Sequence, residues 1–393
     1  MLLVLPTATY RAPDFLAAAR AVGADVVVAS EAEQAMASAM GDRAVTIDLC
    51  DPVDAAKRIA RVRGLDAVIG VDEQGVLVAA HAAAALGLPH NPPEAVAITR
   101  DKARLREALS MASLRQPRVL HIDASDSSAA TFDRGASYVV KATSLSGSRG
   151  VIRADSPDAL ADAVERVRRI AGEGASVIVE EYVPGAEVAV EGLLSAGALE
   201  VLAIFDKPDP LEGPYFEETI YVTPSRLPGD TQQDITSTVA RACAAIGLAE
   251  GPIHAEVRLP RGEPVVLEVA ARSIGGLCSR SLRFGAGVSL EELILRHALG
   301  LDVGDLRRAR PASGVMMIPI PSSGVLRGVG GVDEARRVVG VDGVEVTIPP
   351  GRPVEALPEG DRYLGFIFAS GETPEAVEGS LRDAHSRLDI DIA

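Results

Sequence analysis

Two short segments near the middle of the chain have the pattern of a β-hairpin: IHAEVRL at Ile253–Leu259 and PVVLEVA at Pro264–Ala270. Successive side chains of a β-strand point to opposite faces of the sheet. In the first segment apolar residues alternate with His254, Glu256 and Arg258, so these three polar side chains are expected to share one face. The pattern therefore predicts a sheet that packs on a core with one face and carries polar groups on the other.

The register of this hairpin brings two glutamates together. The short loop between the strands is expected to pair Leu259 with Val265, and the same register places Glu256 opposite Glu268, with Cβ atoms about 5 Å apart. Glu268 would then lie on the polar face, and Leu267 would point to the apolar face. Like charges in direct opposition destabilise a sheet. A divalent cation such as Mg²⁺, which carboxylates and substrate phosphates bind together, would remove that penalty. The alternative is a pair of solvated glutamates on an exposed face.

A second signal is a strand that ends in lysine and continues into a loop of small residues. Residues 139–151 read VVKATSLSGSRGV, with Lys141 at the strand end. Small residues allow backbone N–H groups to approach phosphate oxygens. Lysine is scarce in this chain beside arginine, so a retained lysine is expected to do something that arginine cannot, such as act as a compact phosphate-binding charge. Either a phosphate-binding loop or a flexible surface turn fits this pattern.

A third segment is rich in glutamate. Residues 177–191 read VIVEEYVPGAEVAVE, which predicts a strand, a Pro-Gly turn and a second strand. Taken alone, its acidic residues need be no more than solvated groups on the surface of a sheet.

The first 90 residues alternate short apolar runs with Ala-rich segments of helical spacing. This alternation is typical of a parallel sheet covered by helices on both faces. The predicted strands are Leu2–Leu5, Asp25–Ala29, Val45–Asp48 and Ala67–Val71, and the predicted helices are Asp14–Val22, Glu31–Met40, Pro52–Arg63 and Gln74–Leu86.

The last part of the chain has a different pattern. From about Pro311 the sequence changes to short strands followed by a closing helix, Pro374–Leu388. This change indicates a third, smaller α+β unit.

The composition excludes several classes of protein. The chain has 393 residues, 47% hydrophobic and 24% charged, as in globular proteins of roughly two or three domains. Its net charge of −16 would repel a nucleic-acid backbone or an anionic membrane. Three distant cysteines form no Cys/His cluster, which argues against zinc and fits a reducing cytoplasm. From the start of the printed sequence and its longest apolar stretch we expect neither a signal peptide nor a membrane-spanning segment.

Taken in order, these segments resemble the ATP-grasp superfamily of carboxylate–amine ligases. The series runs from a helix that begins Asp101-Lys102, through the Lys141 loop and EEYVPGAE, to IHAEVRL and LEVAARSIGG. Within that superfamily the chain is most similar to the L-amino-acid ligases that make dipeptides, because of ETIYVTPS at 218–225 and a C-terminal module that contains VMMIPIPSSG. The resemblance implies an α/β fold with a Rossmann-like N-terminal domain (1–95), an ATP-grasp domain of two α+β subdomains that clasp ATP (96–310), and a small α+β C-terminal domain (311–393).

The resemblance also implies which residues bind ATP. Lys102 and Lys141 match the lysines that hold its phosphates. The backbone of Glu181 and Val183 matches the segment that holds adenine, and Glu187 matches the acid that binds the ribose hydroxyls. The loop that closes over the phosphates corresponds to Ser144, Ser146, Gly147 and Ser148.

The same resemblance assigns the metal ligands and the catalytic group. Glu256 and Glu268 match the ligands of Mg²⁺, or of Mn²⁺ in its place, in agreement with the hairpin register. Arg272 matches the arginine that steadies the phosphate and the tetrahedral intermediate. Together with Lys141 and Glu218 it forms the implied catalytic group.

The residues implied to contact the substrates are Glu218, Tyr221, Arg272, Gly275 and Gly276. Two positions depart from the family pattern. Many members have Asn two residues after the second metal-binding Glu, where this chain has Ala270. Dipeptide ligases often have His where Tyr221 stands, so the substrate preference stays open.

The implied activity is the joining of a small acid to an amine through an acyl phosphate, with release of ADP and phosphate. The implied cofactors are ATP and Mg²⁺, and the implied partners are small-molecule acid and amine substrates. A cytoplasmic homodimer without nucleic-acid or membrane partners is expected. Two alternatives share these motifs: an ATP-grasp ligase or carboxylase of nucleotide or cofactor metabolism, and a non-catalytic nucleotide-binding protein.

Overall fold

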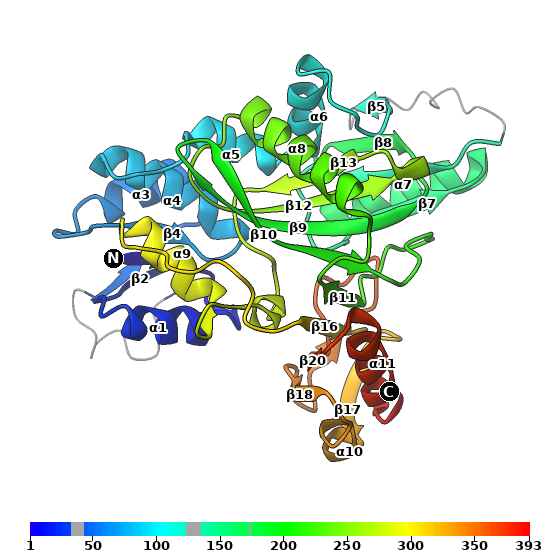
Figure 1. Cartoon of the computed structure of the whole chain (residues 1–393). Helices are drawn as coiled ribbons and strands as arrows, with labels where there is room; N and C mark the ends of the chain where they lie inside the picture. Colours follow the sequence, from blue (N-terminus) through cyan, green and yellow to red (C-terminus); the bar gives the residue numbers. More distant parts are fainter. Residues whose placement is uncertain (33–42, 123–134, 173) are drawn as a thin grey trace.

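The computed structural model describes residues 1–32, 43–122, 135–172 and 174–393. Its first part confirms the predicted parallel sheet, and Figure 1 shows this part in blue beside the larger sheet. The elements are β1 (Leu2–Val4), α1 (Ala12–Ala21), β2 (Val27–Ser30), β3 (Ala44–Thr46), α3 (Pro52–Ile59), β4 (Val68–Gly70) and α4 (Glu73–Leu86). The strands are parallel in the order β3-β2-β1-β4.

Helices cover both faces of this sheet, as the sequence predicted. Leu3 of β1 packs in one core with α1, whereas Leu2 and Val4 pack in another core with α3 and α4. Residues 33–40 of the predicted helix Glu31–Met40 lie outside the described residues.

A second, antiparallel sheet carries the lysine-ended strand. Its strands, in order across the sheet, are β5 (Val119–Ile122), β8 (Val177–Glu181), β6 (Tyr138–Ala142) and β7 (Val151–Ala154). Helix α7 (Pro157–Ala171) packs on it through Leu160, Ala163 and Val167. The small-residue loop connects β6 to β7, so its backbone emerges at the end of this sheet.

The largest sheet joins the predicted hairpin to the C-terminal module. In order across the sheet its strands are β13 (Val265–Ala270), β12 (Gly251–Leu259), β9 (Ala186–Ser195), β10 (Ala198–Lys207), β11 (Ile220–Thr223), β16 (Ala312–Ile318), β20 (Gly365–Gly371) and β18 (Val341–Val346). All neighbouring strands are antiparallel. Backbone pairing therefore crosses the predicted division at residue 310, and the domain boundaries stay a prediction.

One face of this sheet is apolar and covered by helices. Side chains of β9, β12 and β13 share a core with α5 (Pro93–Thr99), α6 (Lys102–Met111) and α8 (Gly229–Ile246). Ile253, Ala255, Val257 and Leu259 all belong to this core, as predicted. His254, Glu256 and Arg258 point to the opposite face, where they line a cavity.

The C-terminal module adds a small sheet and two helices to the strands it shares. The elements are β17 (Gly324–Gly330), α10 (Val332–Arg336), β19 (Pro353–Val354), α11 (Pro374–Ser386) and β21 (Asp389–Ile392). Helix α11 packs on β16 and β20, and β21, which the sequence did not predict, pairs with β17. The segment between β13 and β16 forms η3 (Cys278–Ser281), β14 (Arg283–Phe284), β15 (Val288–Ser289) and α9 (Leu290–Ala298). None of the helices described is both long enough and apolar enough to cross a membrane.

Candidate active site

A cavity of about 480 Å³ lies where the N-terminal sheet, the second sheet, the largest sheet and the C-terminal module meet. Tyr10 and Glu73 come from the first of these parts, Lys141 from the second, Glu256 from the third and Tyr363 from the last. The cavity is lined by all of the site residues named from the sequence except Ser144. The structure therefore brings together residues that are far apart in the sequence.

The pairing of the two hairpin glutamates is confirmed. Glu256 of β12 is the direct partner of Glu268 of β13. The two side chains are 22% and 26% exposed, so their carboxylates remain open to the cavity. Two facing carboxylates with access to a cavity are a fitting donor set for Mg²⁺, which prefers oxygen ligands.

The hairpin reaches this pairing by a different route from the one predicted. The register shifts by one residue beyond Glu256, so Arg258, and not Leu259, pairs with Val265. The extra residue on the second strand is Leu267, which lines the cavity instead of joining the apolar face. The prediction for Leu267 was wrong because a β-bulge interrupts the alternation of side chains.

Lys102 connects the small-residue loop with the glutamate pair. Its ammonium Nζ donates a hydrogen bond to the carbonyl oxygen of Leu145 at 2.6 Å and lies 3.7 Å from Oε2 of Glu268. Lys102 is the first residue of α6, whose N-cap Asp101 accepts hydrogen bonds from the backbone N–H groups of Ala103 and Arg104. The predicted phosphate lysine is therefore placed between the loop and the predicted metal ligands.

Lys141 is held by a buried carboxylate. Its Nζ lies 2.8 Å from Oε2 of Glu180, while Nε of Arg106 lies 2.6 Å from the other oxygen of that carboxylate. Burial acts to raise the pKa of Glu180, but Arg106 and Lys141 outweigh burial and lower it to about 2. Glu180 therefore stays ionised and fixes the Lys141 ammonium at the edge of the cavity.

The small-residue loop is attached to the C-terminal module. Gly150 N–H donates to the carbonyl oxygen of Pro358 at 2.8 Å, and Arg149 Nε donates to that of Glu359 at 3.0 Å. Arg166 of α7 forms two hydrogen bonds with the Glu359 carboxylate, of 2.8 and 3.0 Å. The segment that makes these contacts continues into Tyr363, which lines the cavity.

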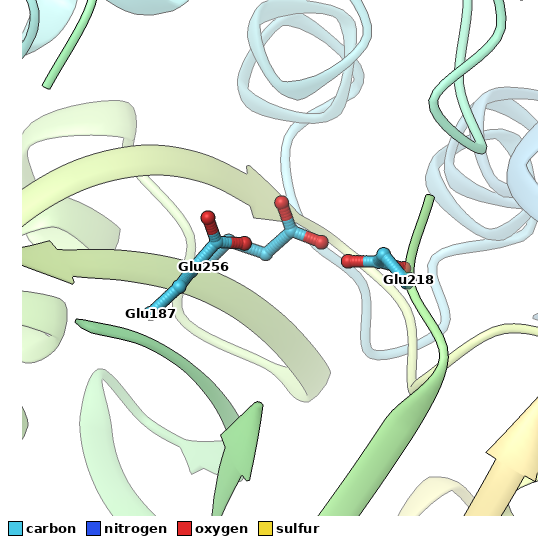
Figure 2. A group of neighbouring side chains, drawn as sticks. All are labelled: Glu187, Glu218 and Glu256. Carbon is cyan, nitrogen blue, oxygen red and sulfur yellow. The ribbon is translucent and has the colours of Figure 1, made fainter. Parts of the chain in front are cut away.

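A buried lysine that the sequence reasoning left without a role lies among three carboxylates. Figure 2 shows the carboxylates of Glu187, Glu218 and Glu256 turned toward one another, and one oxygen of each lies within 4.8 Å of the others. Lys207 Nζ is 2.7 Å from Glu187 and 3.4 Å from Glu256, and it also donates to Glu218. Its ammonium therefore takes the central position that a metal ion would need, which leaves Glu256 and Glu268 as the better metal pair. The scarcity of lysine was the signal that could have identified Lys207.

The charged groups in this cluster shift one another's pKa values. Burial lowers the pKa of Lys207, but the three carboxylates outweigh burial and hold that pKa well above its usual value. Burial raises the pKa of Glu256, but Lys207 and His254 outweigh it and hold the pKa well below its usual value. Burial, opposed by Lys207 and helped by the charge of Glu256, raises the pKa of Glu218 to about 7. Glu218 is therefore the member of the cluster that can exchange a proton near neutral pH.

The predicted adenine segment is held by Arg258. Arg258 Nη1 donates to the carbonyl oxygen of Val183, and its Nε donates to Glu187, both at 2.7 Å. The guanidinium also lies over the rings of Tyr182 and Phe216, which stack with centroids 6.3 Å apart. One strand residue thus fixes both the segment expected to hold adenine and the acid expected to hold ribose.

Arg272 is oriented by a residue from the N-terminal part. Its Nε lies 2.8 Å from Oε2 of Glu73, the first residue of α4, 199 positions away in the sequence. Gly275 and Gly276 line the cavity next to Arg272, and Gly276 is tightly packed. Gly276 has φ +62°, and a Cβ there would lie 2.9 Å from a ring carbon of Phe366, so a larger residue would not fit.

His254 and Glu191 form a buried pair beside the glutamates. Glu191 Oε1 accepts from His254 Nδ1, and Glu191 Oε2 accepts from the backbone N–H of Ile274 at 2.9 Å. The other ring nitrogen of His254 lies 3.6 Å from Oε1 of Glu256. Burial lowers the pKa of His254, but Glu191 and Glu256 outweigh burial and raise it to about 9. Sequence reasoning placed His254 on the polar face without assigning it a partner.

Comparison with known families agrees with this geometry. An ATP-grasp domain model matches residues 135–281, and an ATP-grasp N-terminal domain model matches residues 16–90. The chain belongs to the ATP-grasp superfamily. A model described as L-amino acid ligase C-terminal domain 2 matches residues 316–393 of this ATP-grasp chain.

Individual proteins similar to this ATP-grasp chain include two that are named ligases and one that is named a synthase. The crystal structure of L-amino acid ligase from Bacillus licheniformis has a TM-score of 0.85 and 26% sequence identity, and the alignment covers 100% of this chain and 98% of that one. Alanine–anticapsin ligase of Bacillus subtilis (strain 168) is 27% identical over 268 residues, which are 62% of this chain and 56% of that protein. Carnosine synthase 1 of Gallus gallus is 33% identical over 163 residues, 40% of this chain and 17% of that protein. The chain thus spans little more than half of the first curated relative and less than a fifth of the second.

The two departures from the ATP-grasp pattern both lie beside the glutamates. Tyr221 is buried, and Lys207 Nζ is 5.0 Å from the centroid of its ring. Ala270 of β13 is the direct strand partner of His254. Each departure therefore adjoins one of the charged groups that sequence reasoning had left unassigned.

Proposed function

We propose that this chain is an ATP-dependent ligase that forms an amide bond between two amino acids or related small molecules. The substrate carboxylate attacks the γ-phosphorus of ATP, and ADP leaves, which gives an acyl phosphate. The amine of the second substrate attacks the acyl carbon, phosphate leaves, and the amine loses a proton. The observation that carries this proposal is that the phosphate lysines, the facing Glu256 and Glu268, and Arg272 line one cavity.

The first step brings two anions together, so the site must neutralise charge. Lys102 and Lys141 both line the cavity, and each is fixed by a protein oxygen. Arg272 is 13% exposed, its Nε is held by Glu73, and its Nη1 donates to the carbonyl oxygen of Ser273 at 3.0 Å. Among the contacts of the described residues, Nη2 is therefore left to bind a phosphoryl oxygen. We propose that the two lysines bind the phosphates of ATP and that Arg272 binds the phosphoryl group that is transferred.

The donor set fits Mg²⁺, with Mn²⁺ as the alternative. Glu256 and Glu268 are opposed carboxylates open to the cavity, and we propose that they hold the ion. When bound, the metal would supply positive charge to the ATP phosphates. Ala270 offers no side-chain ligand, so water and phosphate oxygens would complete the coordination shell.

The amine substrate is assigned to Glu218. This carboxylate lines the cavity beside Glu256, where the amine of the second substrate can reach it. Its pKa of about 7 suits it to accept the proton that the amine loses. The small-residue loop, attached to the C-terminal module through Pro358 and Glu359, would keep water from the acyl phosphate.

The test is to identify the nucleotide products by chromatography. Purified protein receives Mg-ATP with pooled amino acids, and the control lacks the pool. ADP and phosphate that depend on amino acids, with an amide product in the mass spectrum, would support the proposal, and splitting the pool would identify the substrates. AMP and pyrophosphate would mean adenylation and would contradict it. Glu268→Gln should abolish turnover while ATP still binds weakly.

We infer that the working form is a cytoplasmic homodimer without a nucleic-acid partner. The net charge of −16 opposes nucleic-acid binding, and the three cysteines are free thiols. The dimer rests on the resemblance to ATP-grasp ligases. Light scattering on a sizing column would distinguish a dimer from a monomer.

A further inference from the structure

We propose that Glu191 and His254 are positioning residues that hold the metal ligand Glu256 in place and link it to the glycine loop. The inference deepens the proposed function, because it concerns the same metal site. It rests on three contacts: Glu191 with His254 between adjacent strands, His254 with Glu256 on one strand, and Glu191 with the backbone of Ile274 in the loop after β13.

The strand register explains why these residues meet. Glu191 of β9 is the direct partner of His254 of β12, and Glu256 follows two residues later on the same face. Glu191 is 1% exposed and His254 is 6% exposed, so the pair is closed off from bulk water. A buried charge needs a partner, and each of these residues is the other's nearest one.

The Glu191 carboxylate determines the orientation of the imidazole ring. A carboxylate only accepts hydrogen bonds, so Nδ1 of His254 must carry the hydrogen that it shares with Glu191. The ring is thereby turned so that Nε2 faces Glu256, 3.6 Å from Oε1. On the other side of His254 the partner residue is Ala270, whose small side chain leaves room for the ring.

The second oxygen of Glu191 extends the link to the substrate side. It accepts from Ile274 N–H at 2.9 Å, immediately before Gly275 and Gly276, which line the cavity. The same loop is fixed from the N-terminal part, because Arg11 Nη2 donates to Ser273 Oγ at 2.7 Å. One carboxylate therefore connects the metal ligand with the loop expected to contact the substrate.

A purely structural pair and a positioning pair predict different results. Loss of a structural pair would lower stability and leave the affinity for metal unchanged. His254 acts on Glu256 as an ion-pair contact at 3.6 Å. Outer groups that orient a metal ligand typically change metal affinity or activity by about 10- to 100-fold when they are removed. Metal affinity in the folded protein is therefore the decisive measurement.

The experiment measures Mn²⁺ binding by electron paramagnetic resonance in the full chain with ADP present. We expect His254→Gln and Glu191→Gln to weaken Mn²⁺ binding by about 10- to 100-fold, without a change in ADP binding in the absence of metal. The Mg²⁺ concentration for half-maximal turnover should rise in parallel, and saturating Mg²⁺ should restore much of the rate. The matched control is His297→Gln, since His297 also lies beside a glutamate, Glu250, at 3.7 Å, but does not line the cavity.

A change in Mn²⁺ affinity of less than about two-fold in folded variants, as in the control, would overturn the proposal. Circular dichroism establishes that each variant is folded. Should His254→Gln not fold, Glu191→Gln gives the same test, because its amide oxygen can still accept from Ile274. Mn²⁺ binding does not depend on turnover, so a wild-type chain that binds Mn²⁺ but joins no amino acids would refute the proposed function and leave this inference standing.

Discussion

The ammonium of Lys207 lies 3.4 Å from the carboxylate of Glu256, although strand β9 separates the strands that carry them. The predicted metal ligand is therefore in contact with a cation that belongs to the protein itself. This cation also neutralises Glu187 and Glu218. The arrangement lets several acids approach one another before any substrate arrives.

Replacing the Lys207 ammonium should destabilise the folded protein. Lys207→Met leaves three buried or half-buried carboxylates without their shared cation, and we expect the free energy of unfolding to fall by about 3–5 kcal/mol. Urea unfolding at pH 7 measures the change. Lys57→Met is the control, because Lys57 is exposed on α3. A loss no larger than that of the control would show that Lys207 does not hold the cluster together.

Lys141→Arg should be damaging even though it conserves charge. The Lys141 side chain is 13% exposed and contacts the buried Glu180, so the larger guanidinium has little room. We expect turnover to fall by at least about tenfold, measured as release of ADP. Lys57→Arg should change nothing. Full activity in Lys141→Arg would refute the argument from scarce lysines.

Arg272→Ala should reduce the rate far more than the affinity for ATP. Loss of one group that stabilises developing charge costs about 100- to 1000-fold in kcat. Glu73→Gln should act in the same direction to a smaller degree, because Glu73 only orients Arg272. Single-turnover rates and ATP dissociation constants separate the two effects. An equal loss in both quantities would assign Arg272 to ground-state binding instead.

Glu180 should make stability depend on pH under acidic conditions. Its pKa is about 2 in the folded protein against an ordinary value of 4.5, so its stabilising contribution is complete above pH 4.5 and is lost as the pH falls toward 2. The free energy of unfolding of the wild type should exceed that of Glu180→Gln by about 3–5 kcal/mol at pH 7. This difference should become smaller below pH 4.5. Urea titrations at several pH values measure it. A gap that stays constant down to pH 3 would exclude the ionised form as its source.

The Glu256–Glu268 pair was predicted from a loop pairing of Leu259 with Val265, and it is present because the bulge at Leu267 offsets the one-residue difference in the actual loop pairing. The bulge at Leu267 could not be predicted, since one inserted residue leaves the local sequence pattern unchanged. The parallel N-terminal sheet could be predicted from the sequence, because its strands and helices alternate along the chain.

Contacts between segments far apart in the sequence could not be predicted from the local sequence pattern. The ion pair of Glu73 with Arg272 joins residues 199 positions apart, and His254 meets Glu191 only through the strand order. No local periodicity records such an order. Lys207 is an intermediate case, because its rarity marked it as unusual without indicating its neighbours.

The continuity of the largest sheet matters for any experiment that recombines this chain with a relative. A crossover placed at residue 310 looks natural in the sequence, yet it would set a foreign β16 against the native β11. That seam contains Tyr221 paired with Val315 and Ile220 paired with Met316. Chimeras that transplant Ile220–Thr223 together with the C-terminal module should therefore fold more often than those that cut at the apparent boundary.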